Sequence, residues 1–257
     1  MMHELEKKEV VLKASGWSNL QLPRGPESFK YGITGDESQI VTIALDANDT
    51  VKGEPGVMMY LTPGVTQRAT CEGCCARCLS GEDCFVMNFT NSGRASNVAY
   101  AALTPNDPMA KVVPVDLSAP EVGGTLIAQK GAFMASYGNV NIGISLDCNC
   151  CRCCCGGLGL VRQKIEGDGI LFIGATGTIV QKVLQENEVI IVDTNCILAF
   201  SESCKLDLKR AGGLLGIVGG GEGIFNTTLT GPGLVIVQSM NKQMFLDALA
   251  ADKIYRR

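Results

Sequence analysis

The sequence predicts an all-β protein: a single domain over 1–257 of three β-sandwich-like repeats with pseudo-threefold symmetry and a short C-terminal helix. Two observations lead to this prediction. A glycine-bounded motif occurs three times, and short segments rich in β-branched residues recur around it. Each copy of the motif begins with glycine, carries an apolar residue at its ninth position and ends with glycine at its thirteenth. The copies are GEDCFVMNFTNSG (81–93), GLGLVRQKIEGDG (157–169) and GEGIFNTTLTGPG (221–233).

A second motif lies upstream of the first and repeats at nearly the same intervals. Its copies are PGVMMY (55–60), KGAFMA (130–135) and TNCILA (194–199). Their second positions, Gly56, Gly131 and Asn195, are 75 and 64 residues apart, and the glycines that open the first motif are 76 and 64 residues apart. Because two motifs share these offsets, we predict an N-terminal segment over 1–27 and repeats over about 28–104, 105–178 and 179–240.

Strands are the expected elements within each repeat. The segments are short, often alternating, and bounded by Gly, Pro, Asn or Asp. They are QIVTIAL (39–45), GTLIAQ (124–129), VNIGISL (140–146), ILFIGA (170–175), EVIIVDT (188–194) and GLVIVQS (233–239). The dipeptides Asp168-Gly169 and Pro232-Gly233 predict tight turns between antiparallel strands. Only 241–257 has apolar residues at a loosely helical spacing, which predicts a C-terminal helix.

The charge and hydropathy of the chain exclude several classes of protein. The net charge is −4, and the 22 Lys and Arg residues are dispersed, so we expect no nucleic-acid partner. No apolar run approaches the roughly 18 residues that cross a membrane. The N-terminus lacks the pattern of a signal peptide or presequence, so we expect a cytoplasmic protein. The apolar loop 211–220 offers a peripheral contact with a membrane or, as we prefer, with protein.

Ten of the 13 cysteines form two clusters, each placed directly before a motif glycine. The clusters consist of Cys71, Cys74, Cys75 and Cys78, and of Cys148, Cys150, Cys151, Cys153, Cys154 and Cys155. Both contain Cys-x-x-Cys pairs, which suit soft, tetrahedral metals because two thiolates reach one ion from a single turn. Equivalent places in two repeats would bring the clusters to one end of the domain. These ten residues are therefore a candidate site for zinc, with copper(I) or an iron–sulfur cluster as alternatives.

Other uses of these thiols stay open. The third repeat has the apolar stretch 212–220 where the first two have cysteines, so the clusters could serve packing or oligomer contact, since free cysteine behaves as a small hydrophobe. Redox sensing, disulfides and palmitoylation are further alternatives, although cytosolic thiols usually stay reduced. The single cysteines Cys84, Cys196 and Cys204 lie in expected strands, where we predict core positions.

The motifs also resemble a known family. The segments GAFMAS (131–136), VDTNCILAF (192–200) and GEGIF…LTGPGLVIVQS (221–239) are similar to the altered-inheritance-of-mitochondria protein 24 family, formerly a domain of unknown function. The resemblance spans about 28–240 and implies a fold like that of the tryptophan RNA-binding attenuator protein, repeated three times. It implies no established catalysis. Eukaryotic members are associated with mitochondrial inner-membrane organisation, and the expected presequence for that role is not seen here.

No catalytic residue is predicted. The only histidine, His3, lies near the N-terminus, which argues against Ser–His and Cys–His pairs. Asp116, Asp168 and Asp193 lie in or beside predicted turns, where they are expected as turn or cap residues. We therefore expect a non-enzymatic scaffold, a homo-oligomer that self-associates through the equivalent loops at one end of the domain. The alternative is a metal- or thiol-cluster-binding module that uses loops 71–78 and 148–155, and an enzyme is the weakest interpretation.

Overall fold

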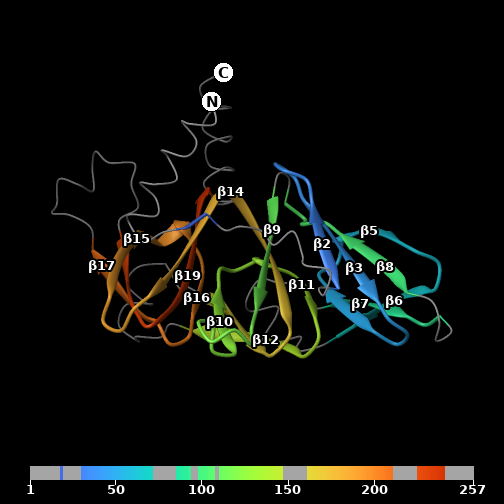
Figure 1. Ribbon diagram of the computed structural model, residues 1–257. Helices are drawn as coiled ribbons and strands as arrows, with labels where there is room; N and C mark the ends of the chain where they lie inside the picture. The colour runs from blue at the N-terminus through green and yellow to red at the C-terminus, as the bar shows by residue number, and fades with distance from the viewer. Residues whose placement is uncertain are drawn as a thin grey trace, which may run out of the picture. The chain divides into compact units, whose positions relative to one another are not determined.

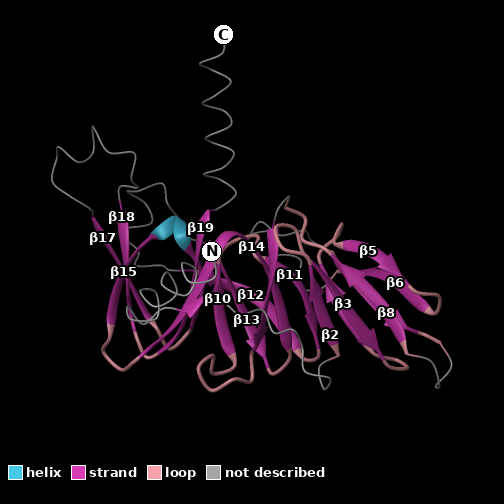
Figure 2. Ribbon diagram, turned by 45° about the horizontal axis from the view of Figure 1, so that its top comes forward, coloured by secondary structure: helices cyan, strands magenta, loops and turns pink. Residues whose placement is uncertain are grey.

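The protein is built almost entirely from antiparallel strands, as Figures 1 and 2 show. The computed structural model describes residues 18–19, 30–71, 85–93, 98–107, 110–146, 161–210 and 225–240. The predicted all-β class is confirmed. Within these ranges the only helix is the single 3₁₀ turn η1 (Thr194–Cys196), and no helix there is long and apolar enough to cross a membrane. The predicted C-terminal helix, 241–257, lies outside the described residues.

Nineteen strands follow one another along the described part of the chain. They are β1 (Ser18–Asn19), β2 (Tyr31–Thr34), β3 (Ile40–Leu45), β4 (Thr50–Gly53), β5 (Met58–Leu61), β6 (Val65–Thr70), β7 (Val86–Asn91), β8 (Ala99–Leu103), β9 (Ala110–Asp116), β10 (Thr125–Ala128), β11 (Phe133–Tyr137), β12 (Val140–Leu146), β13 (Val161–Gly167), β14 (Ile170–Leu184), β15 (Val189–Asp193), β16 (Ile197–Ser201), β17 (Lys205–Arg210), β18 (Phe225–Thr230) and β19 (Gly233–Met240).

The chain divides into two compact units, and the boundary falls within β14. The first unit spans 22–175, and the second consists of 1–21 and 176–257. β14 continues nine residues beyond the predicted strand 170–175, because residues 176–184 pair with β19. The predicted single domain and its pseudo-threefold symmetry concern how these parts are arranged, and they stay predictions.

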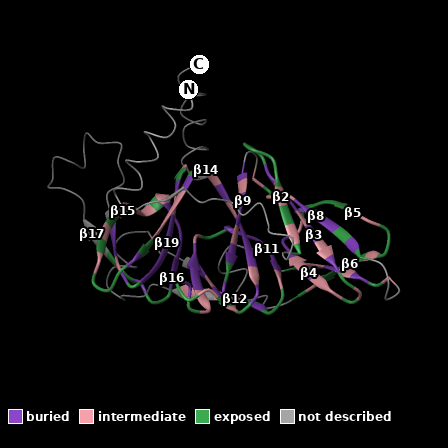
Figure 3. Ribbon diagram, viewed as in Figure 1, coloured by how far each residue is buried: buried purple, intermediate pink, exposed green. Residues whose placement is uncertain are grey.

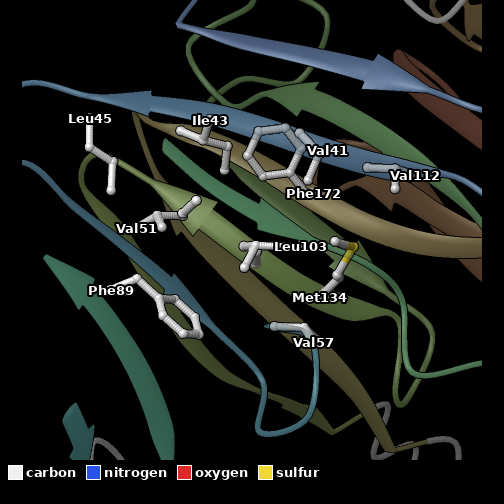
Figure 4. Close-up of a cluster of buried hydrophobic side chains, with 12 residues drawn as sticks. Val41, Ile43, Leu45, Val51, Val57, Phe89, Leu103, Val112, Met134 and Phe172 are labelled. Carbon is white, nitrogen blue, oxygen red and sulfur yellow. The ribbon is translucent and has the colours of Figure 1, made fainter. Parts of the chain in front are cut away.

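The first unit contains a core formed by residues from strands that are distant in sequence. β3 alternates strictly between half-buried and buried residues and directs Val41, Ile43 and Leu45 into this core. The same cluster receives Phe89 from β7 and Phe172 from β14, and Figure 4 shows these side chains together. This packing joins the four-stranded sheet β2–β3–β8–β5 to the strands β4, β7, β11 and β14.

The second unit contains two groups of strands. β15, β18 and β17 form a three-stranded antiparallel sheet with β18 in the middle. β19 lies between β14 and β16 and is antiparallel to both. The short β1 pairs with the same part of β14, through Ser18 opposite Gln181 and Asn19 opposite Val180.

One pairing scheme occurs three times in the chain. A central strand, here called the D-strand, lies between an A-strand and a C-strand and is antiparallel to both; a B-strand follows each A-strand in sequence. The A-strands are β4, β10 and β15, the B-strands β5, β11 and β16, the C-strands β6, β12 and β17, and the D-strands β7, β13 and β18. The aligned apolar positions of A- and D-strands are opposite each other in all three sets: Val51 and Phe89, Leu126 and Ile165, Ile190 and Leu229.

The two predicted tight turns are present, but the strands that they join do not pair with each other. β13 pairs with β10 and β12, whereas β14 pairs elsewhere; β18 pairs with β15 and β17, whereas β19 pairs with β14 and β16. A Cβ atom on Gly169 would meet the carbonyl oxygen of Tyr137, so this glycine allows the chain to cross closely over β11. The expectation of hairpins was therefore wrong, because the same turn residues serve bends between strands that pair with other partners.

Candidate functional site

β5 is an end strand whose outer edge has no neighbouring strand in the described part of the chain. On its inner side it pairs with β8, and the register shifts between Met58 and Tyr60, which makes Met59 the extra residue of a β-bulge. The side chains of Met58, Met59 and Tyr60 are 42%, 55% and 44% exposed. Figure 3 shows this strand among the exposed segments of the first unit. Three neighbouring large apolar residues on a sheet edge form an unusual surface for a protein in water.

β15 is a second apolar end strand, in the other unit. It pairs on one side with β18, and no described strand lies along its other side. Ile191 is 68% exposed and Val189 54% exposed, and both are β-branched aliphatic residues. The charged residues nearest to this edge, Glu188 and Asp193, lie at the two ends of the strand. The middle of the edge is therefore apolar.

Two other end strands, β6 and β17, are polar. β6 is the end strand of its sheet and exposes Thr66, Gln67 and Arg68. β17, at the end of the sheet that begins with β15, has the charged alternation KLDLKR. Charged and polar side chains on an edge discourage pairing with another chain. The apolar edges β5 and β15 lack this protection.

The first unit also shows how an A-strand and a B-strand pair when both are covered. β11 is antiparallel to β4, with Ala135 opposite Gly53, Ser136 opposite Lys52 and Tyr137 opposite Val51. We call this contact the β11–β4 junction. Ala135, Ser136 and Val51 are at most 2% exposed there. A B-strand of the second set thus covers the A-strand of the first.

A polar cluster fastens the end of this junction. Lys30 Nζ donates to Asp46 Oδ2 at 2.8 Å, to Asp49 Oδ2 at 2.9 Å and to the Tyr137 hydroxyl at 3.0 Å. The Tyr137 hydroxyl in turn donates to Asp49 Oδ2 at 2.8 Å, and Lys30 Nζ lies 5.6 Å from the centre of the tyrosine ring. Charge-assisted hydrogen bonds of this length join the end of β11 to the turn that precedes β4.

The pKa shifts of Lys30, Asp49 and Tyr137 indicate that these groups stabilise the structure. The side-chain hydrogen bonds to Asp46, Tyr137 and Asp49 raise the pKa of Lys30, so this amine stays protonated. Burial on its own would raise the pKa of Asp49, but hydrogen bonds from Lys30, Tyr137 and the Asp46 amide together hold it below its ordinary value. Burial raises the pKa of the Tyr137 hydroxyl. A charged lysine and an ionised aspartate that bind each other supply neither a free base nor a nucleophile.

Nine of the ten predicted metal ligands lie outside the described residues: Cys74, Cys75, Cys78, Cys148, Cys150, Cys151, Cys153, Cys154 and Cys155. Cys71 follows β6 directly and is disulfide-bonded, which agrees with the disulfide alternative at this one position. A metal is bound by a thiolate, so Cys71 does not offer that ligand in this state. Within the described ranges no three His, Cys, Asp or Glu residues gather as a metal group.

The segments that carry the cysteines have the same place in the pairing scheme. Each connects a C-strand to its D-strand, and the flanking residues are opposite each other: Thr70 and Val86, Leu146 and Val161, and Arg210 and Phe225 in the third set. The metal site and its zinc, copper(I) or iron–sulfur occupant stay predictions. Elemental analysis of anaerobically purified protein tests them, and a folded protein without metal would contradict them.

The single cysteines differ from the expectation of core strand positions. Cys196 is half-buried in the 3₁₀ turn η1, and Cys204 is buried in the turn between β16 and β17, where its Sγ lies 3.5 Å from the Pro232 carbonyl oxygen. Burial raises the pKa of Cys204 to about 11, so this thiol is inert near neutral pH. The predicted core position is therefore confirmed for Cys204, but the strand assignment was wrong for both residues, because Cys196 lies in η1 before β16 and Cys204 in the turn before β17. Cys84 lies outside the described residues.

The predicted turn aspartates behave as expected at two positions. Asp116 Oδ1 accepts hydrogen bonds from the amide and hydroxyl of Ser118 at 2.9 and 2.6 Å. Asp193 Oδ1 accepts from the Asn195 amide at 2.8 Å and caps η1. Asp168 lies in the bend between β13 and β14. The sequence interpretation missed the two apolar edges, although the apolar segments MMY (58–60) and VIIV (189–192) are visible in the sequence.

Fold and surface together define a class: an antiparallel all-β protein with three similar strand sets and two apolar sheet edges. The chain belongs to the AIM24 family, since residues 31–240 match the family described as mitochondrial biogenesis AIM24. It is also similar to the crystal structure of protein SPYM3_0169 from Streptococcus pyogenes, with 25% sequence identity and a TM-score of 0.66. That similarity covers 86% of this chain and 98% of the other. No curated protein matches the chain.

Proposed function

We propose that this protein is a non-enzymatic scaffold that associates with further copies of its own chain. One observation carries the proposal: two end strands, β5 and β15, expose apolar side chains along edges that no described strand covers. Unpaired N–H and C=O groups beside exposed apolar residues favour pairing with another strand. The sequence alone placed self-association in the equivalent loops 71–78, 148–155 and 211–220. The edges are a second surface that supports the same function.

The contrast with the polar edges supports this proposal. If every sheet edge of the molecule faced water in its working state, charged residues would be favoured on all of them. Instead, β6 and β17 carry polar and charged residues, and β5 and β15 carry Met, Tyr, Val and Ile. The family assignment is compatible with a structural role, and it adds no reaction to the polar cluster described above.

Sedimentation velocity over roughly a hundredfold range of concentration tests this function, because self-association depends on protomer concentration by mass action. We expect species heavier than the 27.2 kDa chain. The measurement is made with and without reductant, so that a disulfide between chains is distinguished from strand pairing. A single 27.2 kDa species at every concentration, under both conditions, would refute the proposal.

A further inference from the structure

We propose that β5 of one copy pairs with β15 of a second copy, antiparallel, so that the chains join head to tail. This inference rests on the proposed function and names the surface and the partner, which is a second copy of this chain. It follows from the pairing rule of the β11–β4 junction, from the correspondence of the three strand sets, and from the exposure of the two end strands.

The junction supplies the rule. There a B-strand, β11, covers the free side of an A-strand, β4, through three residue pairs. β5 is the B-strand of the first set, and no described A-strand lies against its outer side. β15 is the A-strand of the third set, and no described B-strand lies against its outer side. Each molecule thus presents one uncovered edge of each kind.

The correspondence of the sets is visible in their pairing registers. Val51 of β4 is opposite Phe89, and Ile190 of β15 is opposite Leu229, which is the same motif position. The B-strands correspond too, because each has a register shift at the same place. The shifts lie between Met58 and Tyr60, between Phe133 and Ala135, and between Ile197 and Ala199. The residue pairs of the junction therefore predict which residues of β5 and β15 lie opposite each other.

This transfer specifies a register. The junction residues Ala135, Ser136 and Tyr137 correspond to Tyr60, Leu61 and Thr62, and their partners Gly53, Lys52 and Val51 correspond to Val192, Ile191 and Ile190. The expected pairs between copies are Tyr60 opposite Val192, Leu61 opposite Ile191 and Thr62 opposite Ile190. The pairing with β18 fixes the face of Ile191, so a slip of one residue between the copies would put Leu61 and Ile191 on opposite faces of the joined sheet.

Residues of the two edges are more exposed than the corresponding residues of the junction, as expected where a covering strand is missing. Ala135 at the junction is fully buried, and its counterpart Tyr60 is 44% exposed. Lys52 is half-buried at the junction, and its counterpart Ile191 is 68% exposed. Pairing of the edges would cover parts of both Ile191 and Tyr60. Since the two edges differ, the contact is heterologous, and such contacts produce closed rings or open filaments.

Complementary blocked variants test the inference. Met59→Lys with Tyr60→Lys places two charges on the β5 edge, and Val189→Lys with Ile191→Lys does the same on β15; all four side chains are exposed, so the fold should persist. Each blocked protein alone should sediment at 27.2 kDa. An equimolar mixture should form a species of twice that mass and nothing larger, because only one pair of edges remains intact. Gln67→Lys on the polar edge β6 is the matched control and should leave the wild-type mass unchanged.

Several outcomes would overturn the inference. Self-association of the β15-blocked protein alone would show β5 pairing with β5, and a monomeric mixture would show that another surface joins the copies. An assembly unaffected by either double variant would refute this interface while leaving the scaffold function intact. A monomeric wild type would refute both. The single substitutions Tyr60→Lys and Ile191→Lys repeat the test if circular dichroism shows that a double variant is unfolded.

Discussion

The β11–β4 junction and the edges of β5 and β15 are made of the same kinds of strand in opposite situations. At the junction a B-strand covers an A-strand, and Ala135, Ser136 and Val51 are buried. At the edges no described strand covers either one; Tyr60, the counterpart of Ala135, is exposed, and Ile190, the counterpart of Val51, is half-buried. β11 and β4 cover each other, whereas no described strand lies along the outer side of β5 or β15. The comparison is the basis for placing the proposed association surface on β5 and β15.

The two situations also differ in polar contacts. Tyr137 ends β11 and joins Lys30 and Asp49 across the junction. Thr62 has the corresponding position after β5, and its hydroxyl accepts from the Tyr100 amide at 2.7 Å within its own sheet. Hydrogen bonds of Tyr137 therefore hold the junction together, whereas Thr62 stabilises the pairing of β5 with β8.

The largest expected effect compares the buried and exposed apolar residues directly. Phe89→Ala should lower the free energy of unfolding by about 3–5 kcal/mol, because it leaves a cavity in the core beside the junction. Ile191→Ala should change it by less than about 0.5 kcal/mol in the dissociated chain, since the side chain is exposed. Urea unfolding followed by circular dichroism measures both. Equal losses would show that Ile191 is covered within its own chain.

A smaller effect is expected at the glycine of the junction. A Cβ at Gly53 would lie 2.9 Å from Val57 Cγ2 and 3.4 Å from the Met134 carbonyl oxygen. Gly53→Ala should therefore cost about 1–3 kcal/mol of unfolding free energy through overpacking. Gly32→Ala on β2 is the control, since nothing lies within 4 Å of its Cβ, and it should be neutral or slightly stabilising. A neutral Gly53→Ala would show that the junction is loosely packed.

Removal of the tyrosine hydroxyl should weaken the junction modestly. Tyr137→Phe deletes the bonds to Asp49 and Lys30 and should lower the free energy of unfolding by about 0.5–1.5 kcal/mol. Tyr100→Phe, an exposed tyrosine of β8, serves as the control and should change it little. Thermal unfolding at neutral pH compares the two variants with the wild type. A Tyr137→Phe variant as stable as the control would show that these hydrogen bonds do not stabilise the junction.

The smallest expected effect is the acid dependence of the same cluster. The pKa of Asp49 is lowered in the folded state, so its stabilisation is present above the ordinary aspartate pKa of about 3.9 and is lost as the pH falls through the folded-state value. The loss should be below about 1 kcal/mol, because Lys30 and Asp49 are partly solvated. Urea unfolding from pH 5 downward measures it. Asp49→Asn should lack this component, and an unchanged acid slope in that variant would contradict the assignment.

The sequence allowed the strands to be predicted because their signals are local. β-branched alternation in QIVTIAL and VNIGISL appears as β3 and β12 almost residue for residue. The turn aspartates Asp116 and Asp193 were also predictable, since their bonds reach only two residues along the chain. The hairpins expected at 168–169 and 232–233 were not found, because the partner of a strand is decided by contacts far away in sequence.

The sequence by itself determined the β class, the family and the positions that correspond between repeats, since periodicity and motif spacing are properties of the chain alone. Only the tertiary structure decided which edges remain uncovered. Val51 and Ile190 have corresponding sequence positions, yet Val51 is buried under β11 and β15 has no described strand on its outer side. Burial depends on which strand arrives as a neighbour, and the strand that covers Val51, β11, lies about 80 residues further along the chain.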